Sequence, residues 1–240
     1  MRGYKPWKTL AGRGPRDEAQ TSIAPDDASG VLMSQIDHGP YAVLKRPIWF
    51  EAVQDLFVRN DARRVLADSY IKPQPGDRVL DIGCGTGSML PYLGDIVYTG
   101  VDPEPRYIDA ARRRYAARGT FVQSGARELA ERYENAFDIA IAIGVLHHLD
   151  DAEAASLFAT ARKALKPGGR FVTSDPVRLS PQHPVARFLI YLDRGRSVRS
   201  QQGYFALAEP NFRHIRTELR HDFMRLPYDH CVIVCEKDRD

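Results

Sequence analysis

The stretch "VLDIGCGTGSML", residues 79–90, constrains the fold of this chain more than any other part of the sequence. A short apolar run ends in Asp81, and Gly83, Gly85 and Gly87 follow at alternating positions. Glycine lowers the stability of regular structure, so this spacing indicates a turn with positive φ angles or a backbone that a ligand approaches closely. A strand, a glycine-rich turn and a helix start together form the arrangement that binds nucleotides at the carboxyl end of a parallel sheet.

Short apolar strands alternate with helical segments around and after this turn. Strands are expected at "RVLDIG", "IVYTGVD", "GTFVQS", "FDIAIAIG" and "GRFVTSD". Helical spacing predicts buried stripes in residues 104–119 and 151–169, formed by Tyr107, Ile108, Ala111 and Tyr115 and by Leu157, Phe158, Ala161, Ala164 and Leu165. Gly168 and Gly169 are expected to end the second helix. This alternation predicts an α/β fold with a parallel sheet and helices on both faces.

The chain is interpreted as a single domain with a flexible arm. Residues 1–36 are rich in Gly, Pro, Asp, Ser and Arg without an apolar period, which indicates the arm, and residues 37–240 form the domain. An amphipathic helix is expected from Pro47 and another over 61–70. Residues 176–212 break the alternation and predict an insert with helices at 185–192 and 204–208. The runs at 214–223 and 230–237 predict a closing antiparallel hairpin.

Composition excludes several classes of protein. The chain has no apolar run of about 18 residues, so no membrane span is expected, and its N-terminus lacks the apolar stretch of a secretory signal. A cytoplasmic location is therefore expected. A net charge of +3 gives little drive to bind nucleic acid, which is not expected as a substrate. Cys84, Cys231 and Cys235 form neither a disulfide framework nor a zinc site, and no metal is expected.

Two features narrow the ligand of the glycine turn. Ser88 stands where a dinucleotide-binding motif needs its third glycine, and Asp81 would repel a pyrophosphate while it suits a cationic ligand. Asp102 follows Asp81 by about 20 residues, the spacing at which a carboxylate reaches ribose hydroxyls. These features favour a nucleoside that carries a positive group and lacks a diphosphate.

The motifs "VLDIGCGTG", "GVD", "FDIAIAIGVLHHLDD" and "ALKPGGRFVTSD", in this order over residues 75–177, resemble those of class I S-adenosylmethionine-dependent methyltransferases. The resemblance implies a Rossmann-like seven-stranded mixed sheet, mostly parallel, with an antiparallel C-terminal hairpin. It also implies S-adenosyl-L-methionine as cofactor and S-adenosyl-L-homocysteine as product. Asp81 and the backbone of Gly83 to Gly87 would hold the amino acid part, and Asp102 the ribose. The cofactor-binding candidates are Asp81, Gly83, Cys84, Gly85, Thr86, Gly87, Asp102, Pro103, Gly125, Ala126 and Gly144.

One position departs from the pattern of that family. Gly125 stands where members often carry an acidic residue that meets the adenine amino group. The adenine would then depend on the backbone near Ala126, on apolar neighbours such as Pro103, or on a contact from another residue.

Two histidines are the candidates for catalysis. His147 and His148 follow the strand "FDIAIAIG", and imidazoles titrate near neutral pH, so either could accept a proton from the methyl acceptor. His148 is preferred, because the equivalent position carries a base in some related sugar and lipid methyltransferases. The alternative is a packed or hydrogen-bonded histidine that lines the cofactor site. His221, Tyr228 and His230 are expected to be structural.

The insert at 176–212 is the expected lid over the acceptor. Its segment "DRGRSVR" supplies Arg194 and Arg199, which could bind an anionic acceptor or form a solvated basic face. Tyr191 is a further candidate, although its helical spacing with Phe188 favours packing in the core. Asp175 could contact substrate or cap the next turn.

These features predict an enzyme that moves a methyl group to oxygen or nitrogen of a small molecule, glycan or lipid-like metabolite, as a monomer or homodimer. An inactive cofactor-binding partner subunit is one alternative. An NAD-dependent oxidoreductase is another, disfavoured by the missing third glycine and by the lack of a Tyr-x-x-x-Lys pair.

Overall fold

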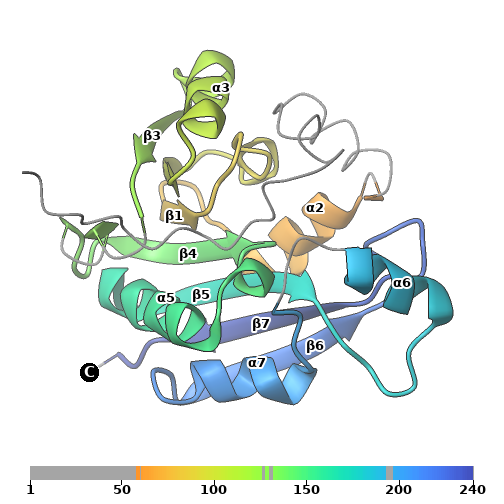
Figure 1. Ribbon diagram of the computed structural model, residues 1–240. Coiled ribbons are helices and arrows are strands. Elements are labelled where there is room, and N and C mark those ends of the chain that lie inside the picture. The colour runs from red at the N-terminus through yellow and green to blue at the C-terminus, as the bar shows by residue number, and fades with distance from the viewer. Residues whose placement is uncertain (1–57, 60, 126–127, 130–131, 193–196, 240) are drawn as a thin grey trace, which may run out of the picture. The chain divides into compact units, whose positions relative to one another are not determined.

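Seven strands form one mixed sheet in the order β3-β2-β1-β4-β5-β7-β6 (Figure 1). The computed structural model describes residues 58–59, 61–125, 128–129, 132–192 and 197–239, all within one unit, Val31–Asp240. The strands are β1 Arg78–Ile82, β2 Val97–Asp102, β3 Gly119–Gln123, β4 Phe137–Ile143, β5 Leu165–Pro176, β6 His214–Arg220 and β7 His230–Glu236. Strands β1 to β5 pair in parallel, and β7 runs antiparallel to β5 and β6. The mixed α/β sheet expected from the sequence is confirmed.

Alternate side chains of the strands pack into two apolar cores, one on each face of the sheet. Leu80 of β1 packs in the core that includes Leu157 of α5 (Asp151–Ala164) and Tyr204 of α7 (Gln201–Ala208). Val79 packs in the other core, which includes residues of η2 (Leu66–Ile71) and α3 (Pro105–Tyr115). The central strand β4 is buried on both sides, as its almost continuous apolar sequence predicts. The helices therefore cover both faces of the sheet (Figure 1).

Two helix boundaries differ from the expectation. The glycine turn leads into further turns and only a three-residue 3-10 helix, η3 Leu90–Tyr92, because Pro91 supplies no backbone donor and Gly94 follows with a φ of 72°. The helix start expected directly after the glycine turn is therefore wrong. Helix α5 ends at Ala164, before the two glycines, because Leu165 already pairs with Phe137 of β4.

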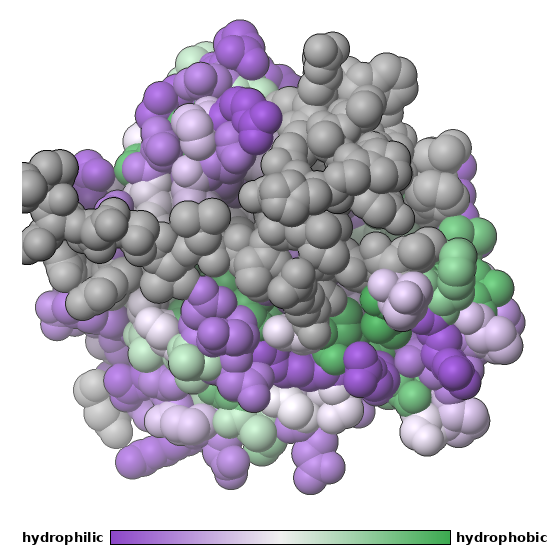
Figure 2. Space-filling view, viewed as in Figure 1, coloured by the Kyte–Doolittle hydropathy of each residue, from purple (hydrophilic) through white to green (hydrophobic). Residues whose placement is uncertain are grey.

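The insert contains both expected helices, α6 Pro184–Leu192 and α7. Ala186 is fully buried, and Leu189 and Ile190 are partly buried, so these three residues form the inner side of α6. Phe188 and Tyr191 lie on the outer side and are 59% and 84% exposed. The expectation that they pack in the core is therefore wrong. Apolar side chains consequently gather at the surface over α6 (Figure 2).

The helix expected over 61–70 is confirmed as α2 (Ala62–Val65) followed by η2. The arm at 1–36 and the amphipathic helix expected from Pro47 lie outside the described residues. In the part of the chain that is described, none of the helices combines the length and the apolar character needed to cross a membrane.

Candidate functional site

The carboxyl ends of β1, β2 and β4 meet at one edge of the sheet. The strand order reverses between β1 and β4, because β2 and β3 extend the sheet on one side while β5 extends it on the other. In open α/β sheets a ligand binds outside the strand ends at such a reversal. The segments that follow these strands begin at Gly83, Pro103 and Gly144, and all three were predicted to bind the cofactor.

The glycine loop after β1 is held against β2 by its backbone. The amides of Gly83 and Cys84 both donate to the Val101 oxygen, at 2.8 and 3.0 Å. Gly83 has a φ of 72°, and a Cβ there would lie 2.7 Å from Val145 Cγ2. Gly85 also has a positive φ, 54°, but no heavy atom of the described residues lies within 4 Å of the position of its Cβ. Packing therefore requires a glycine at 83, whereas Gly85 keeps a space open.

Asp102 joins this loop to the segment after β2. Its Oδ2 accepts a hydrogen bond from the Gly85 amide at 3.0 Å, and its Oδ1 accepts one from the Glu104 amide at 2.9 Å. Burial raises the pKa of this carboxyl to about 6, although both amide bonds lower it. A carboxylate has roughly four acceptor positions, so Asp102 retains capacity for two further donors.

Asp81 lies inside the protein rather than at the surface of the crevice. Its side chain is 3% exposed, and its Oδ2 accepts a hydrogen bond from the Tyr98 hydroxyl at 2.6 Å. The pKa of Asp81 is raised to about 7, mainly by burial; the hydrogen bond from Tyr98 lowers it, and the charge of Asp102 raises it. The structure thus gives Asp81 a buried partner, Tyr98, that no sequence signal indicated.

The other cofactor candidates differ in accessibility. Cys84 and Thr86 are buried, and burial raises the pKa of the Cys84 thiol well above its usual range. Gly87 has a φ of 80°, and a Cβ there would lie 3.1 Å from Tyr115. Gly144 has a φ of 71°, and its amide donates to Ser174. Pro103 is exposed, and Ala126 lies outside the described residues.

A carboxylate lies near Gly125 although that position itself lacks one. Ser124 Oγ donates to Glu128 Oε2 at 2.8 Å, and no heavy atom lies within 4 Å of a Cβ built on Gly125. Glu128 is therefore the acidic side chain closest in sequence to the place where the resembling family often has one.

His147 and Asp175 form a buried pair after β4 and at the end of β5. The Nδ1 of His147 lies 2.9 Å from Asp175 Oδ1, and the His147 backbone amide donates to the same oxygen at 3.2 Å. The two residues are only 7% and 1% exposed. Among the described residues, Asp175 Oδ2 has no hydrogen-bond partner. Asp175 thus holds one ring nitrogen of His147 rather than capping a turn.

His230 belongs to the same cluster, which the sequence did not predict. It pairs with Pro176 across the sheet, so β7 brings it next to the end of β5. Burial lowers the pKa of His230 to about 4; the charge of His147 lowers it too, and that of Asp175 raises it. His148 is half-buried, with its ring centroid 3.9 Å from that of His147. Only the sheet register could have revealed His230, because it lies far from His147 in the sequence.

The predicted substrate-binding residues of the insert are not brought together. Arg199 points inward: its guanidinium donates to the oxygens of Leu146, Ser197 and Leu149 and to Asp151, at 2.8–3.0 Å. Tyr191 is exposed on α6, and Arg194 lies outside the described residues. Arg199 therefore serves the fold, and the structure does not support it as a contact to an anionic acceptor.

No metal site is present in the described parts of the chain, where no cluster of three or more His, Cys, Asp or Glu could hold an ion. His221 pairs with Asp229 at 2.6 Å on the protein surface. Cys231 and Cys235 are buried in the core, as expected from their shared face of β7.

Comparison with known proteins identifies the domain. The model of a family described as "Methyltransferase domain" matches residues 79–169. Phosphoethanolamine N-methyltransferase 1 of Arabidopsis thaliana is 33% identical over 137 residues, which are 55% of this chain and 27% of that protein. The 27-O-demethylrifamycin SV methyltransferase of Amycolatopsis mediterranei is 35% identical over 109 residues, 42% of this chain and 39% of that protein. The chain thus spans well under two thirds of these relatives.

A solved structure shows the same fold. The phosphoethanolamine N-methyltransferase 2 of Haemonchus contortus, in complex with phosphomonomethylethanolamine and S-adenosylhomocysteine, superposes with a TM-score of 0.65 at 17% identity. The match covers 82% of this chain and 59% of that chain. Residues 79–169 thus match a methyltransferase domain, and the solved structure shares the fold in which this part of the chain lies.

Proposed function

We propose that this protein transfers a methyl group from S-adenosyl-L-methionine to an oxygen or nitrogen atom of a small molecule, which includes glycans and lipid-like metabolites. The observation that carries the proposal is the position of Asp102 and Gly85. They lie together where β1, β2 and β4 end. The Asp102 carboxylate, which can accept further hydrogen bonds, lies there beside the open backbone of Gly85. The acceptor class is supported by the names of three relatives: a phosphoethanolamine N-methyltransferase, an O-methyltransferase and a 27-O-demethylrifamycin SV methyltransferase.

The residues present fit this cofactor. Asp102 has acceptor capacity for the two ribose hydroxyls, and the space at Gly85 admits the part of the ligand next to the ribose. Glu128, beside Gly125, supplies a carboxylate for the adenine amino group. Asp81 and Asp102 place two acidic groups near the loop, and they favour a cationic ligand over a diphosphate.

The chemistry requires alignment and, for a protonated acceptor, a base. The cofactor supplies an electrophilic methyl group on a positively charged sulfur. Asp175 holds the Nδ1 of His147, so that in the neutral ring Nε2 carries the lone pair that takes the acceptor's proton. Of the two histidines, His147 is thus the better candidate for the base, although the sequence favoured His148.

Location and assembly form the less specific part of the proposal. The three cysteines of the chain are buried as thiols, as is usual for a cytoplasmic protein. A small-molecule acceptor needs no second protein, so a monomer or homodimer is sufficient for the reaction.

Titration calorimetry with S-adenosylhomocysteine and with NADH tests the proposal. We expect heat of binding with S-adenosylhomocysteine and none with NADH. The Asp102→Asn variant should bind S-adenosylhomocysteine about tenfold to hundredfold more weakly, because charge-assisted hydrogen bonds are lost. Affinity should also fall as pH is lowered through about 6, the pKa of Asp102, because a protonated carboxyl loses acceptor capacity.

The control variant is Asp95→Asn, which changes an exposed carboxylate just before the amino end of β2, opposite to the carboxyl ends where the site lies. It should leave the affinity unchanged at every pH. Binding of NADH without binding of S-adenosylhomocysteine would contradict the proposal. Binding of S-adenosylhomocysteine, with no label passed from radiolabelled S-adenosylmethionine to any fraction of cell extract, would favour the inactive partner subunit.

A further inference from the structure

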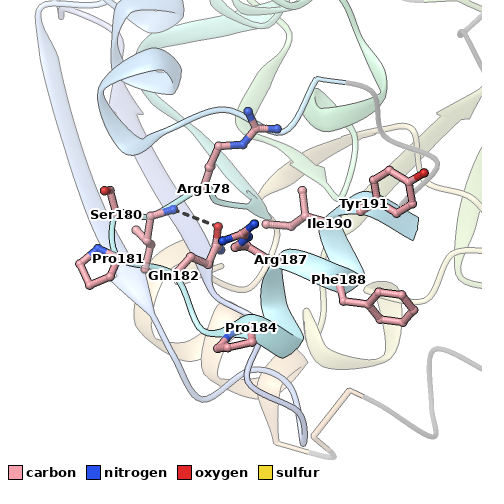
Figure 3. A pocket seen from close by; sticks show the side chains of 10 residues that line it. Arg178, Ser180, Pro181, Gln182, Pro184, Arg187, Phe188, Ile190 and Tyr191 are labelled. Atoms are coloured by element: carbon pink, nitrogen blue, oxygen red, sulfur yellow. Dashed lines mark hydrogen bonds between the residues drawn. The ribbon is translucent and has the colours of Figure 1, made fainter.

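A groove of about 970 Å³ lies between α6 and the segment that joins it to β5 (Figure 3). Its floor includes Gln182, whose side-chain amide donates to the Val177 oxygen at 3.0 Å, while its side-chain oxygen accepts from the Leu179 amide at 3.3 Å. Both ends of the Gln182 side chain are therefore bound to the wall of the groove. The volume is that of a site for a small organic molecule.

Two arginines give this groove a positive charge. Arg178 and Arg187 line it, and among the described residues no acidic side chain does. Figure 3 shows the Arg187 side chain lying inside the groove beside Gln182, with Arg178 extending from the opposite wall. Within the described residues neither guanidinium forms an ion pair, in contrast to Arg199, which is fully engaged by the fold. Two unpaired guanidiniums provide a binding point for an anionic group.

Exposed apolar side chains form the other wall. Phe188 and Tyr191, at 59% and 84% exposure, lie one helical turn apart on α6, where Figure 3 shows both rings on the same side of the helix. Large apolar side chains on a protein surface beside polar groups mark binding sites. A ligand with an apolar or aromatic body would cover these rings while its anionic group meets the arginines.

The groove is linked to the His147 pair through the backbone. Arg178 follows Asp175 by three residues, a span of at most about 10 Å. The Arg178 amide donates to the Arg199 oxygen at 2.9 Å, and the nearby Ser197 amide donates to the His147 oxygen at 3.1 Å. The groove therefore begins a few residues along the chain from the His147 pair.

We propose that this groove binds the body of the methyl acceptor, and that the acceptor is an amphiphilic anion: a molecule with a carboxylate, phosphate or sulfate group attached to an apolar or aromatic part. Arg178 and Arg187 bind the anionic group, and Phe188 and Tyr191 contact the apolar part. This inference rests on the proposed methyl transfer, since it assigns the groove to the acceptor of that reaction.

Two fluorescent probes that differ by one anionic group test the groove. 8-Anilinonaphthalene-1-sulfonate is an aromatic anion, and N-phenyl-1-naphthylamine is the same skeleton without the sulfonate. We expect the double variant Arg178→Gln, Arg187→Gln to weaken sulfonate binding about tenfold, as for loss of charge-assisted contacts, and to leave the neutral probe within about twofold. The double variant Phe188→Ala, Tyr191→Ala should bind both probes more weakly. Arg113→Gln, which changes an exposed arginine of α3, is the matched control and should change neither.

The outcomes separate this inference from the proposed function. Unchanged sulfonate affinity in the double arginine variant overturns the groove assignment, whatever the cofactor result. The assignment is also overturned if the protein co-sediments with phosphatidylserine vesicles through the two arginines while its affinity for the sulfonate probe does not depend on them. That pattern indicates that the arginines bind a membrane surface. S-adenosylhomocysteine binding measured on the same variants should equal that of the wild type. If the wild-type protein does not bind S-adenosylhomocysteine, that result contradicts the methyltransferase proposal and leaves the probe results on the groove as they are.

Discussion

A buried carboxylate beside an imidazole sets the orientation of His147. Asp175 accepts from both the backbone and the ring of this residue, so the ring can neither rotate nor exchange its tautomer without breaking a hydrogen bond inside the protein. Such a third group, which orients the base, is the usual partner of a catalytic histidine. The half-buried His230 adds a neutral neighbour, since its pKa of about 4 keeps it uncharged at neutral pH.

The His147→Gln variant should lose about a hundredfold or more of its rate of methyl transfer, because it removes the proton acceptor. Asp175→Asn should reduce the rate by less and change its dependence on pH, since the ring of His147 loses its anionic partner. The measurement is the initial rate of label transfer from radiolabelled S-adenosylmethionine to the accepting extract fraction, between pH 6 and pH 9.

The neighbouring His148→Gln variant is the control for this experiment. Because the pair with Asp175 is made by His147, we expect the His148 variant to retain more activity than the His147 variant. The reverse order would restore His148 as the base, and equal, unchanged rates in both variants would show that the acceptor needs no base.

At the scale of the element, the loop after β1 contains two glycines with positive φ and different surroundings. A methyl group on Gly83 would meet Val145 at 2.7 Å, and Val145 is buried with a stiff side chain. In the described part of the chain, a methyl group on Gly85 would meet nothing within 4 Å. The first glycine therefore permits packing between two strand ends, and the second leaves room for a ligand.

Gly83→Ala should lower the free energy of unfolding by about 2–4 kcal/mol, from overpacking added to an unfavourable φ. Gly85→Ala should lower it by only about 1 kcal/mol, the backbone part of the penalty, yet weaken S-adenosylhomocysteine binding because the methyl group occupies the ligand's space. Urea unfolding and calorimetry on both variants check this. If both variants lose a similar free energy of unfolding and Gly85→Ala binds S-adenosylhomocysteine as the wild type does, the space at Gly85 does not belong to the ligand.

At the scale of the whole molecule, Arg199 ties together segments that are distant in sequence. Its guanidinium binds the backbone oxygens of Leu146 and Leu149 before α5, and Asp151 at the start of that helix. The side chain is 10% exposed. One residue of the insert therefore holds the loop that carries His147.

Arg199→Gln should lower the free energy of unfolding by about 2–4 kcal/mol, because it leaves buried backbone acceptors unsatisfied. It should also lower the rate of methyl transfer more than it lowers cofactor affinity, since the His147 loop loses its support. Urea unfolding with Arg113→Gln as the exposed control tests the first part. A stability equal to that of the control would show that the contacts of Arg199 contribute little.

Much of the fold could be predicted from the sequence because its signals are local. The short apolar run of β1, the almost continuous apolar run of β4 and the glycines at 83, 85 and 87 are short-range patterns, and they predicted two strands and a turn correctly. Predictions failed where a choice between two faces or two partners was needed. The helical spacing of Phe188 and Tyr191 predicts that both pack in the core, but Ala186 lies on the inner side of α6 and they lie on the outer side.

The sequence by itself determined the order of strands and helices, the glycine turn after β1, and the acidic residues near it, because backbone preference and apolar period act over a few residues. Only the tertiary structure decided which groups meet: Tyr98 with Asp81, His147 with Asp175, and Arg199 with the loop before α5. These partners lie 17 to 53 residues apart. Such pairs depend on sheet register and helix packing, which place distant residues together and leave no pattern in the neighbouring sequence.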